Sequence, residues 1–478
     1  MDFRFVDLFC GGGGSITGAI NALKAADVKY EGRSYDHWDL AIKTIQANHP
    51  EIVPDFERAC ADIKTVAGSP QSVFDDDPTR LDLLWASPSC THHSNAAGGV
   101  PRSEQMRSQP WDVLSFLTLT RCRRMFVENV PELISWGPVL DRDTVYKGRT
   151  YHAGRVDPRY RGKLFLDWIR AIRHSGYTVD WQILNAANYG AATSRRRLII
   201  QAVRKSSGEK IIWPEPTHAK ILGLFCCQPW RSAAEIIDWS IPGESIFDRA
   251  KPLCENTLRR IEAGIRKYWG AWAEPFLIVL RGTSDRQIDS SAIPLSHPLP
   301  TITTSDHIAL VSPFLTRYNG GDNRNHPVTS PVPVIDCSNR YGVVSPLFIP
   351  QQSAGTVKPC AGNPLPTVAT SGAVGVVQPF LMSYYSNGTT TATDRPCPTI
   401  TTRDRFGLIQ GRILTLPDGR RYKLDITHRM LTARELAAAT GFPADYVFVG
   451  GDTAAKKMIG NAVCPPLAEA LYRSALSA

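Results

Sequence analysis

The chain of 478 residues lacks the features that mark several large protein classes. No run of about 18 apolar residues occurs, so no membrane span is expected. The eleven cysteines form no Cys-x-x-Cys pair, and no group of Cys and His residues has zinc-ligand spacing, so no metal site is expected. We interpret the cysteines as the reduced, mostly buried thiols of a cytoplasmic protein. Met1-Asp2-Phe3-Arg4 leads directly into an expected strand, so no signal peptide is expected.

Charged residues are not gathered into blocks of one sign, which excludes a disordered basic tail as a binding device. The formal net charge is nevertheless +9, a balance that suits a polyanionic partner. Many soluble proteins are equally basic, so the charge alone does not identify that partner. The length is natural for two domains, and the ordinary apolar content is enough for a sizeable core.

The first 200 residues alternate short apolar strands with helical stretches, which predicts an α/β domain built on a doubly wound, mostly parallel sheet. A ligand crevice is then expected at the carboxyl ends of the strands. The expected strands are Phe3–Leu8, Leu81–Trp85, Met125–Glu128, Val179–Ala186 and Arg197–Val203, with a further strand ending at Asp36. The expected helices are Ser15–Ala26, Asp39–Asn48, Trp111–Arg121 and Leu164–Ser175.

The rest of the chain divides where its composition changes. Residues 213–218 are rich in proline and are typical of a linker. An amphipathic helix is expected over Asn256–Tyr268, and helical patterning returns at His428–Ala439 and Pro465–Ala475. We therefore predict a first domain over residues 1–212, a second over residues 213–426, and helices over residues 427–478 that rejoin the first.

Residues 275–410 contain a fourfold internal repeat, which predicts a small β domain with repeated loops. The units are rich in Thr, Val and Pro and poor in helix formers, as strands joined by turns are. An oligomerisation or spacer module is the alternative interpretation. The units begin at Pro275-Phe276-Leu277, Pro313-Phe314-Leu315, Pro346-Leu347-Phe348 and Pro379-Phe380-Leu381.

A glycine-rich loop, Phe9–Gly14, lies between the first expected strand and the first expected helix. Glycines at such a turn let the backbone approach a ligand closely. No register of the loop fits G-x-G-x-x-G, which disfavours a nicotinamide cofactor. S-adenosylmethionine fits better, because it has no pyrophosphate but needs a close turn around its methionine part. Asp36 and Asp62 are candidates for its ribose hydroxyls and adenine amino group, although each is a surface aspartate by default.

Three further motifs stand near expected strand ends. Cys90 precedes a polar, glycine-rich stretch that is typical of a mobile lid, and the alternative is a zinc site with His92 and His93 that lacks a fourth ligand. Glu128 ends a buried strand, where an unused carboxylate would be costly. Strand alternation places Arg195 and Arg197 on one face, and a basic edge strand explains them equally well.

In this order, the motifs resemble those of the DNA cytosine-5 methyltransferases of bacteria and phages. The glycine-rich loop is similar to their cofactor loop, the Cys90 segment to their Pro-Cys loop, and residues 128–130 to their Glu-Asn-Val motif. Residues 188–197 resemble their Gln-x-Arg-x-Arg motif, and residues 434–435, 441–443 and 460–463 resemble their C-terminal motifs. Two positions differ, because Ser89 and Thr193 stand where that family has proline and glutamine. The repeat falls where the family keeps its target-recognition domain, so its polar loops are candidates for reading base edges.

The resemblance implies an S-adenosylmethionine-dependent methyltransferase fold, with no metal, that acts on a cytosine flipped out of double-stranded DNA. Cys90 would add to carbon 6 of the ring, Glu128 would contact nitrogen 3, and Arg197, supported by Arg195, would hold the oxygen on carbon 2. A monomer suffices for this chemistry, and a cognate restriction endonuclease would act separately. The implied cofactor contacts are Phe9, Gly11, Gly13, Gly14, Asp36, Asp62, Ile63, Asn461 and Val463.

Two alternatives keep the fold and change the function. The first is an enzyme that acts on RNA, and the long second domain argues against it, because RNA-acting relatives resemble this family with a much shorter insert. The second is a DNA-binding protein that has lost catalysis. The presence of Cys90, Glu128, Arg195 and Arg197 argues against that alternative, and Ser89 keeps it open.

Overall fold

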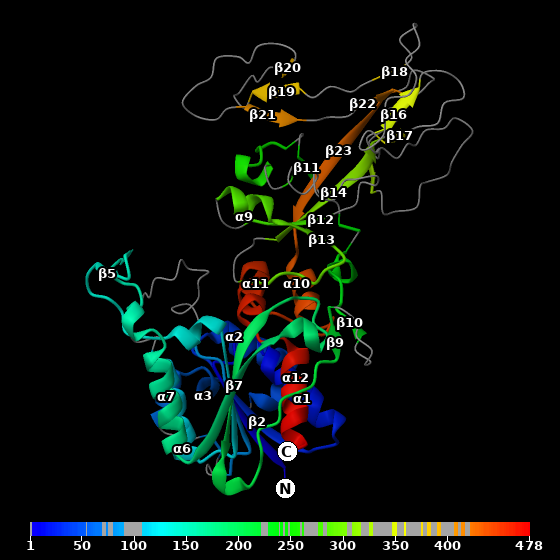
Figure 1. Cartoon of the computed structure of the whole chain (residues 1–478). Coiled ribbons are helices and arrows are strands. Elements are labelled where there is room, and N and C mark those ends of the chain that lie inside the picture. The colour runs from blue at the N-terminus through cyan, green and yellow to red at the C-terminus, as the bar shows by residue number, and fades with distance from the viewer. Residues whose placement is uncertain are drawn as a thin grey trace. The chain divides into compact units, whose positions relative to one another are not determined.

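The computed structural model of the chain divides into two compact units (Figure 1). Unit 1 comprises Met1–Ile237, Ser296–Asp306 and Thr432–Ala478, and unit 2 comprises Asp238–Leu295 and His307–Leu431. The structure describes residues 2–53, 55–68, 73–74, 80–89, 108–220, 228–238, 240–241, 244–246, 249–258, 261, 276–280, 284–303, 308–316, 325–327, 347–350, 358–359, 374–375, 380–383, 390–392, 406–409, 413–415 and 421–478, with strand backbone alone from 312 to 428. Within these residues no helix has the length and apolarity needed to cross a membrane.

Unit 1 is built on a six-stranded sheet of β1 (Phe3–Leu8), β2 (Tyr30–Tyr35), β3 (Leu83–Ala86), β4 (Arg124–Asn129), β7 (Tyr177–Asn185) and β8 (Arg196–Arg204). The strand order is β2-β1-β3-β4-β8-β7. The pairs β1–β2, β1–β3 and β3–β4 are parallel, whereas β8 is antiparallel to both β4 and β7. The start of β8 therefore lies at the edge where the parallel strands end, which we call the carboxyl edge.

Helices cover both faces of this sheet (Figure 1). On one face, α1 (Gly14–Ala25) and α12 (Pro465–Leu476) share a core with the strands, in which Phe5 and Tyr472 are buried. On the other, α6 (Gln109–Thr120) and α7 (Lys163–His174) share a second core that contains Val6 and Trp168. Phe5 and Val6 are adjacent in β1 and enter different cores because side chains alternate along a strand. The predicted α/β domain is thus confirmed, with a mixed sheet in which β8 runs opposite to its neighbours.

Shorter elements complete unit 1. Its other helices of the described residues are α2 (Asp39–Asn48), α3 (Phe56–Ala59), α4 (Ile63–Gly68), α10 (Ala433–Thr440) and α11 (Gly451–Asn461). Its 3-10 turns are η1 (Pro50–Ile52), η4 (Pro131–Ser135), η5 (Pro158–Tyr160), η6 (Ala186–Tyr189), η7 (Lys205–Ser207) and η8 (Ala233–Ile236). Among the residues described in this unit, two strand pairs lie outside the main sheet: β5 (Thr144–Tyr146) with β6 (Arg149–Tyr151), and β9 (His218–Ala219) with β10 (Gln228–Pro229).

The expected elements of the first 200 residues are present to within a few residues at their ends. The helix expected over His428–Ala439 is wrong in its first part, because β23 (Arg421–Met430) occupies those residues and pairs with β14 (Ile308–Thr316). The helix α10 begins only after Thr432, whose hydroxyl accepts a hydrogen bond from the amide of Glu435 while the Glu435 carboxylate accepts one from the amide of Thr432. The helix expected over Asn256–Tyr268 lies mostly outside the described residues.

The segment that was expected to be a linker belongs to unit 1. The amide of Thr217 donates to the carbonyl of Asn188, and the indole of Trp230 donates to the Asn188 side chain at 3.0 Å. The segment 296–306 returns to the same unit, where the amide of Leu299 donates to the carbonyl of Ala192 at 2.7 Å. The unit boundaries therefore fall at residues 237/238 and 431/432 rather than at 212/213 and 426/427.

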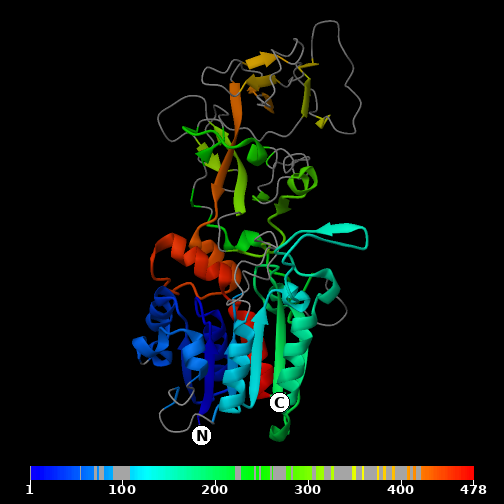
Figure 2. The same cartoon turned by 90° about the vertical axis from the view of Figure 1, so that its left-hand side faces the viewer.

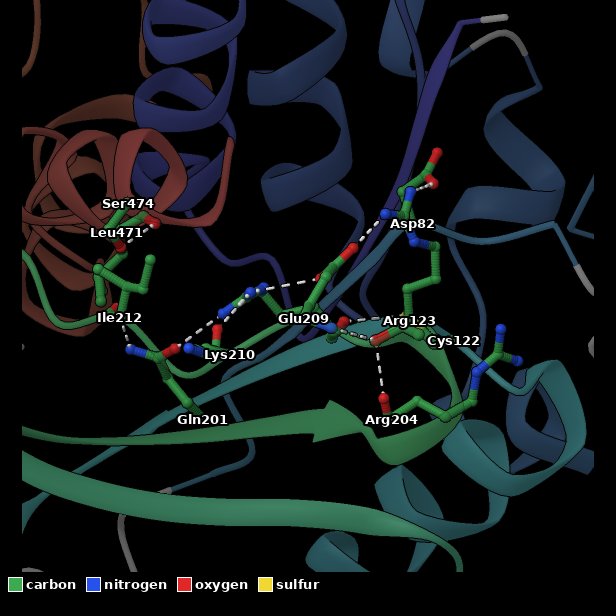
Figure 3. A network of polar contacts seen from close by, with 12 residues as sticks. Asp82, Cys122, Arg123, Gln201, Arg204, Glu209, Lys210, Ile212, Leu471 and Ser474 are labelled. Atoms are coloured by element: carbon green, nitrogen blue, oxygen red, sulfur yellow. Dashed lines mark hydrogen bonds and ion pairs between the residues drawn. The ribbon is translucent and has the colours of Figure 1, made fainter. Parts of the chain in front are cut away.

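A polar network stabilises the opposite, amino edge of the sheet (Figure 3). Arg124 is 2% exposed, and its guanidinium donates to the Gln201 side chain and to the carbonyl of Lys210. Its neighbour Arg123 donates to Asp82 at 2.8 Å and also pairs with Glu209. The buried cation of Arg124 thus has acceptors, as a buried charge requires, whereas Arg123 is exposed. Figure 2 shows both chain termini at this end of unit 1.

Unit 2 consists mainly of strands in its described part. One sheet contains β11 (Glu244–Ser245), β12 (Phe276–Val279), β13 (Ala292–Pro294), β14, β15 (Asn325–Pro327), β22 (Ile413–Thr415) and β23. Two small sheets contain β16 (Leu347–Pro350), β17 (Lys358–Pro359) and β18 (Val374–Gly375), and β19 (Phe380–Ser383), β20 (Thr390–Ala392) and β21 (Phe406–Ile409). The helix α9 (Asp285–Asp289) precedes β13. Strands cover the start of each expected repeat unit, but most of the repeat lies outside the described residues, so the repetition stays a prediction.

Candidate active site

The glycine-rich loop turns sharply between β1 and α1 at the carboxyl edge. Phe9, Gly11 and Gly13 have positive φ values of 60°, 50° and 80°. The amide of Phe9 donates to the carbonyl of Tyr35 at 2.9 Å, which joins the loop to the end of β2. A Cβ added at Gly11 would meet no atom of the described residues within 4 Å. Gly11 therefore leaves room for a ligand to approach the backbone closely.

The other glycines of the loop are required by packing. A Cβ on Gly14 would lie 2.0 Å from the carbonyl oxygen of Val463, and one on Gly13 would lie 2.5 Å from the hydroxyl of Tyr446. That hydroxyl donates to the carbonyl of Gly12 at 2.8 Å. Tyr446 and Val463, both from the C-terminal part of the chain, thus pack against the glycine-rich loop. Gly13, Gly14 and Val463 are expected from the sequence, whereas Tyr446, which lies three residues after the Gly-Phe-Pro motif, is not.

Asp36 follows β2 directly and is 7% exposed. Its Oδ2 accepts the amide of Gly11 at 3.0 Å, and its Oδ1 accepts the amide of Trp38 at 2.9 Å. The hydrogen bond from His37 to this carboxylate raises the pKa of His37. Asp36 therefore fixes the backbone of the glycine-rich loop at Gly11, a function that the sequence did not indicate.

Asp62 and Ile63 stand at the start of α4 on the same edge. The Asp62 carboxylate is exposed and accepts the amide of Lys64 at 2.9 Å, while Ile63 is buried in the core. A parallel bridge between Cys60 and Asp36 brings this segment beside the end of β2. The structure thus brings both predicted acidic residues to the edge that the glycine-rich loop occupies.

Glu128 and Arg197 form an ion pair at the same edge. Glu128 lies near the end of β4 and Arg197 near the start of the antiparallel β8, so the two strands bring them together. Arg197 Nε lies 2.7 Å from Glu128 Oε1, and the two side chains are 9% and 7% exposed. Arg197 Nη1 also donates to the carbonyl of Arg196 at 2.8 Å, which orients its guanidinium. A buried carboxylate is thereby compensated and held in a single direction.

Arg195 lies one residue before β8 and is 1% exposed. Its Nη1 donates to the carbonyls of Ile302 and Gly460, at 2.8 and 2.9 Å. It therefore joins β8, the segment 296–306 and the end of α11, and it acts on the site by fixing its surroundings. Gly460 immediately precedes Asn461, an exposed residue at the end of α11.

The pKa values of two buried groups, Cys464 and Asp7, are influenced by the charged residues of the carboxyl edge. Burial raises the pKa of the Cys464 thiol to about 11, while Arg195 and Arg197 act to lower it and Glu128 acts to raise it. Burial also raises the pKa of Asp7 to about 8, the hydrogen bond from Ser15 opposes this, and the charges of Asp36 and Glu128 add to it. Asp7, a carboxylate inside the apolar strand β1, was missed by the sequence interpretation.

The approach to Cys90 is held at three successive residues. The amide of Ser87 donates to the carbonyl of Leu8 at 3.0 Å, and the Asn129 side chain donates to the carbonyl of Pro88 at 2.9 Å. The amide of Ser89 donates to Gln109 Oε1 at 2.8 Å. Cys90 itself, with the proposed lid and with His92 and His93, lies outside the described residues. No cluster of His, Cys, Asp or Glu suited to a metal ion occurs in the part that is described.

A half-buried aromatic ring was also missed by the sequence interpretation. Trp38 follows Asp36 by two residues, and the ammonium group of Lys457 lies 4.3 Å from the centre of its ring. The sequence signal for Trp38 is its position two residues after Asp36, which follows the end of β2.

A family model and curated methyltransferases match parts of the chain. Its sequence model, described as C-5 cytosine-specific DNA methylase, matches residues 155–226 and 378–477. Type II methyltransferase M.AgeI of Thalassovita gelatinovora is 26% identical over 219 residues, which are 45% of this chain and 42% of that protein. Type II methyltransferase M.AquIA of Picosynechococcus is 27% identical over 254 residues, which are 50% of this chain and 88% of that protein.

A solved structure of a Dnmt2 methyltransferase of S. pombe aligns with 100% of this chain and 99% of its own, at 14% identity and a TM-score of 0.46. The chain spans less than half the length of the first curated relatives that it matches.

Proposed function

Because this chain belongs to the C-5 cytosine-specific DNA methylase family, we propose that it transfers a methyl group from S-adenosylmethionine to carbon 5 of a cytosine in double-stranded DNA. The observation that carries the proposal is the buried pair of Glu128 and Arg197, 2.7 Å apart at the carboxyl edge. A fixed acid beside a fixed cation suits a ring that must gain a proton at nitrogen 3 and hold charge at the oxygen on carbon 2.

The residues at the carboxyl edge fit S-adenosylmethionine. The open space at Gly11 admits a ligand against the backbone. The first turn of α1 has no acidic residue, so the positive end of this helix is available to the carboxylate of the methionine part. Asp36 and Asp62 supply acceptors for the ribose hydroxyls and the adenine amino group. S-adenosylmethionine supplies an electrophilic methyl group when it is bound.

The side chains of this protein would make carbon 5 nucleophilic. The Cys90 thiolate adds to carbon 6, and the electrons of the 5,6 double bond shift toward carbon 5 and the ring. Glu128, in its protonated form, gives a proton or a hydrogen bond to nitrogen 3, and Arg197 holds the oxygen on carbon 2. After methyl transfer, carbon 5 loses its proton to a base and Cys90 leaves, which restores the double bond. The hydrogen bonds at Ser87, Pro88 and Ser89 support this assignment, because the Asn129 side chain ties Pro88, two residues before Cys90 in the sequence, to the end of β4.

Unit 2 would recognise the target sequence through its loops, and double-stranded DNA would be the partner. A monomer holds every proposed catalytic residue, and a restriction endonuclease with the same target would act as a separate protein. Phe9, Gly13, Gly14, Ile63, Asn461 and Val463 complete the proposed cofactor surroundings.

The test is transfer of radiolabelled methyl from S-adenosylmethionine to unmodified duplex DNA by the native protein and by a Cys90→Ser variant. Cys254→Ser is the matched control, because this cysteine is exposed in unit 2. We expect label in 5-methylcytosine with the native protein and the control, and none with Cys90→Ser, which still binds DNA. Label transferred by the Cys90→Ser variant would exclude Cys90 as the nucleophile. Label that appears on RNA alone would exclude the DNA substrate.

A further inference from the structure

A basic hairpin stands between η4 and α7. We call residues 138–161 the basic arm. Its strands β5 and β6 pair antiparallel, with Thr144 opposite Tyr151 and Tyr146 opposite Arg149. Lys147 and Gly148 form the two-residue turn and both have positive φ, 48° and 73°, which is the geometry that joins tightly paired strands. Figures 1 and 2 show the hairpin projecting from unit 1 at the end of the sheet where α7 begins.

The base of the basic arm is fixed to unit 1. The amide of Leu140 donates to the carbonyl of Arg155, and the amide of Asp157 donates to the carbonyl of Pro138, both at 2.8 Å. Leu140 and Asp157 are each 5% exposed. A Cβ added at Gly137 would lie 2.5 Å from the carbonyl oxygen of Tyr160, so the two sides of the hairpin meet closely at its base. The arm therefore leaves the body of the unit in a set direction, although a free two-stranded hairpin is only marginally stable.

The basic arm carries an excess of positive charge. It contains six arginines and lysines against three aspartates. Asp143 Oδ2 lies 3.0 Å from Nδ1 of His152, and Asp157 Oδ2 lies 2.6 Å from Nη2 of Arg159. The exposed cations for which no ion pair is found among the described residues are Arg142, Lys147, Arg149 and Arg161. Their charges remain available to an external anion.

The arm is continuous with the catalytic edge. The chain runs from Glu128 at the end of β4 through η4 directly into the arm. Arg161, at the other end of the arm, lines a hollow of about 410 Å³ together with Pro131, Glu132 and Ile134 of η4. The helix α7 begins immediately after the arm, at Lys163, and is antiparallel to the strands that end at this edge. The basic arm that carries these cations therefore leaves unit 1 on the side of the carboxyl edge, where Glu128 and Arg197 lie (Figure 1).

We propose that the basic arm binds the phosphate backbone of duplex DNA beside the carboxyl edge, through Lys147 and Arg149 at its turn and Arg142 just before β5. The proposal rests on the proposed function, since DNA is the substrate there. Arginine and lysine contacts to phosphates position a protein on DNA without reading its sequence. The arm therefore contributes to affinity and orientation, while recognition of the target is left to other residues.

The test removes these three charges with Arg142→Gln, Lys147→Asn and Arg149→Gln in one variant, which we call the tip variant. Asn is chosen at position 147 because it tolerates a positive φ better than other side chains. The control variant removes three exposed lysine charges at the amino edge, with Lys24→Gln, Lys29→Gln and Lys205→Gln. Binding of a fluorescent DNA duplex of random sequence is measured by anisotropy at several KCl concentrations, and thermal midpoints verify that both variants are folded.

We expect the slope of log Kd against log salt to fall by about 2 to 3 in the tip variant, since each lost phosphate contact removes about 0.9. The control slope should equal that of the native protein. An unchanged slope in the tip variant overturns the proposal, and so does an equal fall of the slope in the control. The proposed function still stands in either case if the native protein binds and methylates DNA. A native protein that binds no duplex DNA overturns both. A tip variant that loses affinity for duplex RNA but not for duplex DNA rejects DNA as the partner of the arm.

Discussion

The amide of Ser89 donates a hydrogen bond to Gln109 Oε1, with 2.8 Å between the two atoms. Ser89 immediately precedes Cys90, and Gln109 is the first residue of α6. Proline, the usual residue of the family at position 89, has no N–H and restricts the chain through its ring instead. Ser89 and Gln109 together thus restrain the same point of the backbone by a hydrogen bond that proline cannot make.

We predict that Gln109→Leu lowers kcat for methyl transfer by about tenfold, because a hydrogen bond of about 1 to 1.5 kcal/mol that positions the chain before Cys90 is lost. Ser89→Pro in the Gln109→Leu background should restore most of the rate, since the proline ring replaces the lost restraint. The measurement is single-turnover methyl transfer at saturating cofactor, together with the cofactor Kd, which should not change. Equal rates in the single and double variants would argue against this positioning function of Gln109.

The pair of Glu128 and Arg197 allows catalysis and stability to be separated. Glu128→Gln should lower methyl transfer by about 10² to 10⁴-fold, while the fold is kept because the amide oxygen still accepts a hydrogen bond from Arg197. Arg197→Leu should lose activity and also about 3 to 5 kcal/mol of unfolding free energy, because it leaves the buried Glu128 carboxylate without its cation. Activity assays and denaturant titrations of both variants check this. Full activity in Glu128→Gln would remove Glu128 from the mechanism.

Two glycines of the same loop should respond differently to alanine. Gly14→Ala places a Cβ 2.0 Å from the carbonyl oxygen of Val463, so the loop and the C-terminal segment must separate and cofactor binding should be lost. Gly11→Ala meets no described atom and has only the cost of a positive φ, about 1 kcal/mol. We therefore expect a weaker effect on stability at Gly11 and a reduced cofactor affinity there only if the ligand lies against this residue. Calorimetric titration with S-adenosylmethionine measures the cofactor affinity of both variants, and thermal unfolding measures their stability. Normal cofactor binding by Gly14→Ala would contradict the packing argument.

Asp7 should make stability depend on pH. Burial raises its pKa to about 8, whereas an unfolded aspartate titrates near 4. Between about pH 4 and pH 8 the native protein keeps a proton that the unfolded chain releases, so the unfolding free energy contributed by this group decreases as the pH rises. Asp7→Asn removes that dependence, worth up to about 5 kcal/mol across the window, while the other groups titrate alike in both proteins. Urea titrations at pH 5 and pH 8 check this, and the same pH dependence in both proteins would refute a neutral Asp7.

The local elements and the order of the motifs can be read from the chain without its fold. Strand and helix periodicity depends on neighbouring residues, so β1 and α2 agree with expectation at both ends. The local pattern failed at His428–Met430, where helical spacing was overruled by pairing with β14. Pairing partners of that kind lie far away in the chain, and no local period reports them.

The groups that meet at the carboxyl edge are brought together by long-range packing. Glu128 contacts Arg197 because β8 runs antiparallel to β4, a direction that the spacing of the motifs does not contain. Arg195 reaches the carbonyl of Gly460, 265 residues away, and Asp36 turns to the amide of Gly11 rather than to solvent. Residue types and their order are properties of the chain, whereas the direction in which a buried charge finds its partner depends on how the strands and the C-terminal helices pack around it.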